Sequence, residues 1–139
     1  MGENVRYSKE AEIKYLTYHG DGQPETYQEK GKPVSRVFFD KEDRIVAKVT
    51  STAKLLDMVC NENAATLENV ITMNNVSIFS LPCTEAIVYR YNGLGLVESV
   101  TVGHGMTVHY RYDGIGRLVE ERDANGRILK TYTYNISYK

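Results

Sequence analysis

Histidine, cysteine and carboxylate side chains could carry chemistry in this sequence, but their spacing matches none of the common sites. The three histidines are His19, His104 and His109, and neither a His-x-His nor a Cys-x-x-Cys spacing is present. A catalytic pair of Cys60 or Cys83 with a histidine is conceivable, yet nothing in the flanking residues supports it. We therefore expect no catalytic residue, no metal site and no cofactor.

Carboxylates and glycines elsewhere fit structural roles better than chemical ones. Glu120 and Glu121 are neighbours, so on a strand they would point to opposite faces and make a poor acid–base pair. The glycine pairs at 93–95 and 103–105 would cradle a phosphate only if a helix followed, and strands are expected there. Tyrosines could stack on sugar rings or anchor a protein partner, but in a repeat they more often pair across strands.

The composition indicates a β-rich protein. The 139 residues include eleven tyrosines, eleven glycines, three prolines and no tryptophan. Tyrosine and β-branched residues suit a pleated, half-buried surface, and glycine supplies the positive φ angles of tight turns. The length fits a single domain with a core of its own.

Charge and hydropathy exclude some partners. The net charge of −1 gives no basic excess for nucleic acid, and no apolar run reaches the roughly 18 residues that a membrane helix needs. Residues 1–12 are polar and charged, so no signal peptide is visible. Two cysteines are too few for a disulfide framework. We expect buried free thiols at Cys60 and Cys83, with a bond between them as the alternative.

A repeat organises the second half of the chain, where Tyr89 and Tyr110 begin two similar stretches 21 residues apart. A fixed period of this kind is typical of repeat architectures. We expect the recurring residues to be structural positions: Tyr89, Tyr91, Asn92, Gly95 and Gly105 in one copy, Tyr110, Tyr112, Asp113, Gly116, Arg117 and Gly126 in the next, and Tyr132 and Tyr134 at the start of a third.

Each copy predicts a β-hairpin. Tyr110 and Tyr112 would share one face of a strand, because side chains alternate. Asp113 can hydrogen-bond its own backbone two residues on, and Gly116 can take the left-handed conformation at the exit of the turn. A second turn follows at Asn125-Gly126, which is a strong hairpin signal.

Weaker copies precede the middle of the chain. Residues 39–46 align without gaps on 112–119, and residues 30–40 align on 125–135. The stretch 18–22 is a further copy of the turn. The fold class expected is therefore all-β: an antiparallel meander of tandem hairpin repeats, forming an open curved sheet, a strip or a partial barrel.

Residues 50–86 break the pattern, so the single domain 1–139 divides into repeats at about 15–49 and 87–139 and an insert between them. Two stretches of the insert, 70–73 and 76–81, alternate and predict strands, and Pro82 ends the second.

A short helix is the other element expected in the insert. Ser51 could cap a helix over residues 52–59, with Leu55, Leu56 and Val59 on one face. The same run could instead be a buried strand.

The pattern Tyr-x-Tyr-Asp-x-x-Gly-Arg-Leu resembles the YD repeats of RHS-type proteins. The likeness is close at 110–119 and 125–134, and good at 89–97, where Asn92 replaces the aspartate and Leu96 the arginine. In that family the repeats form β-hairpin strips that spiral into a hollow shell, which often encloses a toxin or other cargo. Such repeats also occur on bacterial surface proteins.

Two departures from that family bear on function. No cargo domain follows Lys139, and the self-cleaving aspartate motif that closes many such shells is not found. The resemblance therefore implies a short member, or the C-terminal piece of a longer protein, located at the cell surface or secreted. The leading hypothesis is a non-catalytic structural or interaction module. The alternatives are a carbohydrate-binding domain that uses exposed tyrosines, and a small enzyme with its site in the insert.

The end of the repeat run should need covering. Residues 132–138 alternate aromatic or apolar with small polar residues, and they lack the charges and prolines that protect an open sheet edge. We expect the strand near Tyr15–Tyr18 to cover this edge within one chain, with an edge-strand homodimer as the alternative. A protein or carbohydrate partner fits such a module, and nucleic acid does not.

Overall fold

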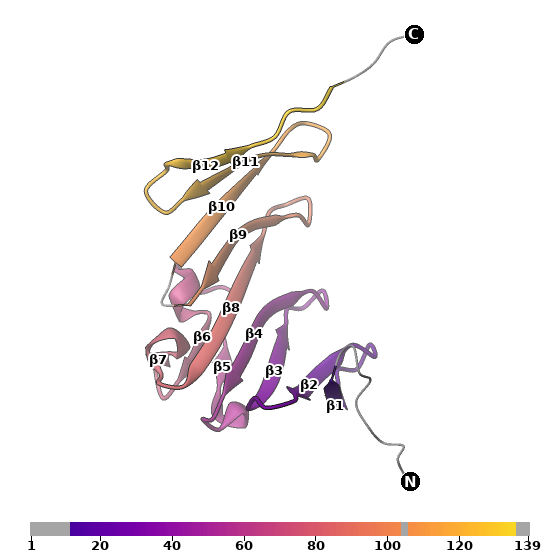
Figure 1. Ribbon diagram of the computed structural model, residues 1–139, viewed down its shortest axis with the longest axis vertical. Helices are drawn as coiled ribbons and strands as arrows, with labels where there is room; N and C mark the ends of the chain where they lie inside the picture. Colours follow the sequence, from indigo (N-terminus) through magenta and orange to yellow (C-terminus); the bar gives the residue numbers. More distant parts are fainter. Residues whose placement is uncertain (1–11, 104–105, 136–139) are drawn as a thin grey trace.

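One long antiparallel sheet dominates the computed structural model, which describes residues 12–103 and 106–135 (Figure 1). Nine of the described strands form it, in the order of the chain: β1 (Ile13–Tyr18), β2 (Pro24–Glu29), β3 (Val34–Phe39), β4 (Ile45–Ser51), β8 (Thr84–Tyr91), β9 (Val97–Val102), β10 (Met106–Tyr112), β11 (Leu118–Asp123) and β12 (Ile128–Thr131). The predicted antiparallel meander is confirmed, and it is an open sheet with β1 and β12 at its edges.

The insert leaves the chain between β4 and β8 without interrupting the sheet. These two strands pair directly, with Ala47 opposite Val88. Within the insert the described residues form a small second sheet and three single turns of 3₁₀ helix: η1 (Leu55–Asp57), β5 (Val59–Cys60), η2 (Leu67–Asn69), β6 (Ile71–Met73), β7 (Val76–Ser77) and η3 (Ile78–Ser80).

The helix predicted over residues 52–59 is wrong, because only the single turn η1 is helical there and Val59 already begins β5. Ser51 is the last residue of β4, and its hydroxyl accepts a hydrogen bond from the Ala53 N–H at 3.0 Å, which makes a turn. Leu56 and Val59 are 78% and 61% exposed, so the three side chains do not share a buried face.

The second insert strand is shorter than predicted. The strand expected at 70–73 appears as β6, but the one expected at 76–81 ends at Ser77. The Ser77 hydroxyl accepts a hydrogen bond from the Phe79 N–H at 3.2 Å and starts η3. This turn places Ile78 in the core, where it is fully buried.

The core lies between the insert and one face of the sheet. Phe38, Ala47 and Val88 face the same side, since Phe38 pairs with Ala47 and Ala47 with Val88. The insert covers them with Met58, Val70, Ile71 and Ile78, all buried. Each fully buried apolar side chain of this size contributes about 1.5–3 kcal/mol. This covered face therefore supplies most of the hydrophobic stabilisation.

Two arginines tie the insert to the sheet. Arg36 on β3 donates from Nη1 to the Leu55 carbonyl at 2.7 Å, and its guanidinium lies 4.3 Å above the Phe38 ring. Arg90 on β8 donates from Nη2 to the Ala64 carbonyl at 2.7 Å. Both acceptors are backbone carbonyls of the insert. Every residue has such a carbonyl, so the sequence does not reveal these contacts.

The opposite face carries a different set of residues. Tyr15 pairs with Tyr27, and alternation along the paired strands places Tyr89 and Tyr110 on the same side. We call this side the tyrosine face. Val37 is a buried apolar residue on this face.

The predicted closure of the sheet is wrong. β1, which contains Tyr15–Tyr18, lies at the far end of the sheet from β12 (Figure 1). Neighbouring hairpins pair in chain order, and their twist alone does not bring the two ends together. Residues 132–135 continue beyond β12 without forming a strand, and the rest of the predicted edge segment lies outside the described residues.

Both cysteines are free, as predicted. Cys60 is half-buried in β5, but Cys83 is exposed, which corrects the expectation of two buried thiols. Among the described residues, no helix has the length and apolar character needed to cross a bilayer.

Candidate functional site

The Tyr–Asp turn at 113–117 is held by the Asp113 side chain. Its Oδ1 accepts the N–H groups of Ile115 and Arg117 at 3.0 and 2.9 Å, and its Oδ2 accepts Arg117 Nε at 2.8 Å. The backbone closes the same loop, because the Gly116 N–H donates to the Asp113 carbonyl at 3.1 Å. Gly116 has φ +87°, a conformation that other residues rarely adopt.

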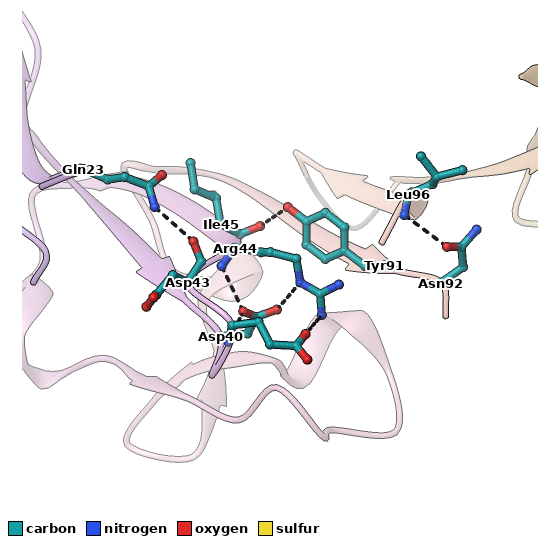
Figure 2. A network of polar contacts seen from close by, with 9 residues as sticks. Gln23, Asp40, Asp43, Arg44, Ile45, Tyr91, Asn92 and Leu96 are labelled. Carbon is teal, nitrogen blue, oxygen red and sulfur yellow. Dashed lines mark hydrogen bonds and ion pairs between the residues drawn. The ribbon is translucent and has the colours of Figure 1, made fainter. Parts of the chain in front are cut away.

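The same arrangement recurs in other turns. Asp40 accepts the N–H of Arg44 at 2.9 Å on Oδ1 and its Nε at 2.9 Å on Oδ2 (Figure 2). Asn92 accepts the N–H groups of Leu94 and Leu96 at 2.9 and 3.0 Å, so an amide oxygen replaces the carboxylate. The turn at 123–127 is built likewise on its aspartate. Positive φ angles follow at 95 and 126, which are glycines, and at 43, which is an aspartate.

These hydrogen bonds favour the charged form of two turn acids, Asp113 and Asp40. The pKa of Asp113 is lowered, chiefly by the Arg117 N–H, with burial opposing and the Arg117 guanidinium assisting. Burial raises the pKa of Asp40, but the N–H groups and guanidinium that it accepts outweigh burial and lower it overall. Both carboxylates are therefore charged and already occupied by their own turns.

A tyrosine connects each of these turns to the previous one. Tyr91 donates its hydroxyl to the Ile45 carbonyl at 2.5 Å (Figure 2). Tyr112 donates to the Val97 carbonyl and Tyr134 to the Leu118 carbonyl, both at 2.6 Å. Tyr91 and Tyr112 each immediately precede a turn, and Tyr134 precedes Asn135, which aligns with the first residue of such a turn. In all three cases the acceptor carbonyl belongs to the first residue after the preceding turn. We call these bonds the tyrosine locks.

Arginine stacking reinforces two of the locks. The Arg44 guanidinium lies 4.6 Å above the Tyr91 ring, and Arg117 lies 4.5 Å above the Tyr134 ring. Leu96 stands at the corresponding place in the turn at 92–96, and its Cδ1 lies 3.8 Å from the point where a Cβ on Gly116 would be. An apolar side chain therefore replaces the arginine where the aspartate is also replaced.

The first turn, at 19–23, departs from this pattern. His19 stands in place of the aspartate, stacks on Phe39 with ring centres 4.0 Å apart, and bonds Asp43 Oδ1 through Nε2 at 2.9 Å. Phe39 stands in place of a lock tyrosine and has no hydroxyl. Gln23 links the two turns instead, since its amide donates to the Asp43 carbonyl at 3.0 Å (Figure 2).

His19, Asp21 and Asp43 bring three metal-ligand atoms within 4.8 Å of one another, a cluster that the sequence prediction missed. Asp43 comes from a different turn, 24 residues away, so no local spacing could reveal it. The ligand atoms already have partners: His19 bonds Asp43, and Asp21 bonds Gln23 through both of its oxygens. The cluster is therefore explained as a contact between turns.

The remaining predicted positions divide between the tyrosine face and the C-terminal hairpin. Tyr89 and Tyr110 are half-buried on the tyrosine face. Burial raises the pKa of Tyr89, and the nearby Tyr27 and Tyr110 hydroxyls add to that rise. Tyr132 donates to the Glu121 carboxylate, and Lys130 lies 4.9 Å from the centre of its ring. Gly105 and His104 lie outside the described residues.

Glu120 and Glu121 serve different partners, as their predicted opposite orientation requires. Glu120 is buried and accepts Arg111 Nε at 3.2 Å and Arg122 Nε at 2.5 Å. Glu121 accepts the hydroxyl of Tyr132. The two carboxylates do not converge on a common site.

Three cavities bear on function. One of about 330 Å³ opens on the tyrosine face between Tyr15, Tyr27 and Lys48. One of about 110 Å³ lies between the turn at 40–44 and the insert and is lined by charged groups that include Glu62. The largest, about 850 Å³ and mostly apolar, lies beside β1.

Residues 91–128 match the RHS Repeat family model. This chain carries an RHS repeat. The match covers the hairpins from β9 to β11, and the turns at 19–23 and 40–44 share the hairpin arrangement outside the matched region. The RHS repeat thus accounts for the Tyr–Asp motif that the sequence analysis singled out.

The chain was also compared with solved structures and with curated proteins. A chain of the TcdB2-TccC3-Cdc42 crystal structure resembles this one at 13% identity and a TM-score of 0.47, covering 84% of this chain. This chain spans only 6% of the length of that chain. A search of curated proteins finds no match.

Proposed function

We propose that this chain is a non-catalytic structural and interaction module of a bacterial RHS-repeat protein that acts at the cell surface or after secretion. The observation that carries the proposal is the lock between Tyr91 and Ile45. It joins residues 46 positions apart, whereas the other two locks span 15 and 16. The repeat strip is therefore continuous through the insert, as a scaffold needs.

The polar groups near the insert support a structural role. Asp40 and Arg44 line the cavity of about 110 Å³ and are bonded to each other. Ligand pockets usually enclose about 300–1,000 Å³. A cavity this small, with Asp40 already paired to Arg44, suits a packed junction between insert and strip better than an enzyme site.

Hydrogen exchange across the strip tests the proposal. A continuous scaffold predicts that the amides joining β4 to β8 are protected as strongly as those joining β9 to β10, because both pairs lie inside the same ladder. Amides at the β4–β8 junction that exchange at the rate of the edge strands would show two separate hairpin units and contradict the proposal.

Carbohydrate binding on the tyrosine face is the second candidate. The cavity of about 330 Å³ favours it, because Tyr15 and Tyr27 flank it with ring centres 6.3 Å apart, and Glu29 and Lys48 add polar groups. Tyr15 is 49% exposed, so its ring is open to a ligand. Aromatic rings can supply the apolar surface on which a sugar ring packs.

Titration of neutral and acidic oligosaccharides tests this second candidate. Binding should be lost in Tyr27→Ala and kept in the matched variant Tyr132→Ala, which removes a tyrosine from the far hairpin. Equal binding by both variants, or saturation by no oligosaccharide, would contradict it.

A further inference from the structure

Tyr18 occupies the position of a lock tyrosine, and it makes no lock to another described residue. It immediately precedes the turn at 19–23, just as Tyr91 and Tyr112 precede theirs. Those two reach across to the strand on the N-terminal side of their own, from β8 to β4 and from β10 to β9. Among the described residues β1 has no strand on that side, and Tyr18 is 59% exposed.

Among the described residues, no strand covers the outer side of β1. Its six residues include one charge, Lys14, and no proline or glycine. Tyr15 and Leu16 are also exposed. Proteins usually protect such an edge with charges, prolines or a covering segment, because its free N–H and C=O groups can pair with another strand.

An apolar cavity runs beside the same edge. It measures about 850 Å³ and lies between β1 and the start of the insert. Leu16 and Tyr18 line it from the edge, and Val34, Leu55 and Leu56 line it from the strip and the insert. β2 also lines the cavity, with Thr26 and Gln28, so the cavity adjoins the open edge on its β1 side.

We infer that the outer edge of β1 binds an antiparallel β-strand of the same repeat type, supplied by another polypeptide. The bound strand is one that follows a Tyr–Asp turn. Its backbone pairs with β1, and its carbonyl one residue after the turn accepts the Tyr18 hydroxyl. The inference rests on the proposed role as a repeat module, and names the partner of that module.

The interface already present three times within the chain carries this inference. β9 follows the turn at 92–96, pairs with β10, and receives the Tyr112 hydroxyl on Val97. A strand added to the outer side of β1 would stand to β1 as β9 stands to β10. At the opposite edge, the described tyrosines are already bonded, because Tyr134 donates to Leu118 and Tyr132 to Glu121.

A synthetic peptide of residues 92–103 is the probe, since it contains the turn and β9. Labelled with a fluorophore, it is titrated with the full chain and followed by anisotropy, beside a scrambled peptide of the same composition. We expect saturable binding of the native peptide alone. Tyr18→Phe should weaken it about three- to tenfold, the value of one hydrogen bond.

Two variants complete the design. Leu16→Glu places a charge at the edge and in the cavity and should abolish binding, whereas Tyr134→Phe, at the opposite edge, should bind normally. Equal binding of both peptides, or no effect of either Leu16→Glu or Tyr18→Phe, would overturn the inference. Binding that appears only after residues 2–11 are deleted would also overturn it, by assigning the edge to this chain's own segment.

The proposed function is judged separately. Protection of the β4–β8 junction against hydrogen exchange does not depend on the peptide. If the peptide does not bind but the β4–β8 amides are protected, only the proposed partner strand is wrong. If those amides are not protected, the proposed structural module itself is wrong.

Discussion

The two faces of the nine-stranded sheet are completed in different ways. The face that carries Phe38 and Val88 is covered by the insert, with buried apolar side chains on both sides. The tyrosine face has no such layer among the described residues, and its tyrosines are half-buried or exposed. The insert therefore stabilises the strip, whereas the tyrosine face is available for contacts.

The largest loss of stability is expected when a side chain that covers the insert face is truncated. Ile78→Ala removes a fully buried side chain of the insert and should cost about 2–5 kcal/mol of unfolding free energy. Ile87→Ala, on the tyrosine face and only partly buried, should cost clearly less. Chemical denaturation measures both, and equal losses would mean that the two faces are packed alike.

The turn acids should give the next largest effect. Asp40 is buried and accepts three hydrogen bonds, so Asp40→Ala should cost about 1.5–3 kcal/mol. Asp40→Asn should cost less, because Asn92 makes the same backbone contacts with an amide oxygen. A larger loss for the asparagine variant would show that the turn depends on charge and not on its backbone hydrogen bonds.

Stability should fall in acid. The pKa values of Asp40, Asp113 and Glu120 are lowered in the folded protein, so these groups stabilise it above their unfolded pKa values of 3.8 to 4.5. That contribution is lost as pH falls through the lower folded values. The pKa of His19 is raised by its bond to Asp43, and its small contribution is instead lost as pH rises above about 6.5.

Thermal unfolding between pH 3 and pH 8 checks these directions. We expect the melting temperature to drop steeply below about pH 4. In Asp40→Asn the drop should be smaller, because one of the titrating groups is gone. A melting temperature that stays constant down to pH 3 would contradict the assignment of charged, bonded turn acids.

The hairpins could be predicted from the sequence because their determinants are local. Asp113 and Gly116 sit at fixed offsets within one turn, and alternation along a strand fixes which side chains share a face. The antiparallel meander and the RHS repeat follow from these features alone.

The insert and the contacts between turns could not be predicted in the same way. Ile78 ends a strand early because burial against the sheet outweighs its alternating pattern. The acceptors of the tyrosine locks are backbone carbonyls, so no residue type marks Ile45 or Val97. The contact between His19 and Asp43 joins two turns, and its spacing carries no signal.

The strip continues unbroken from β4 to β8, and the tyrosine locks provide a test of this continuity. Unfolding free energies are compared for Tyr91→Phe, whose lock spans the insert, and Tyr112→Phe, whose lock does not. Each removes one hydroxyl and should cost about 0.5–1.5 kcal/mol, whereas Tyr15→Phe, on the exposed edge strand, should cost almost nothing. A loss of unfolding free energy in Tyr112→Phe with none in Tyr91→Phe would contradict a continuous strip.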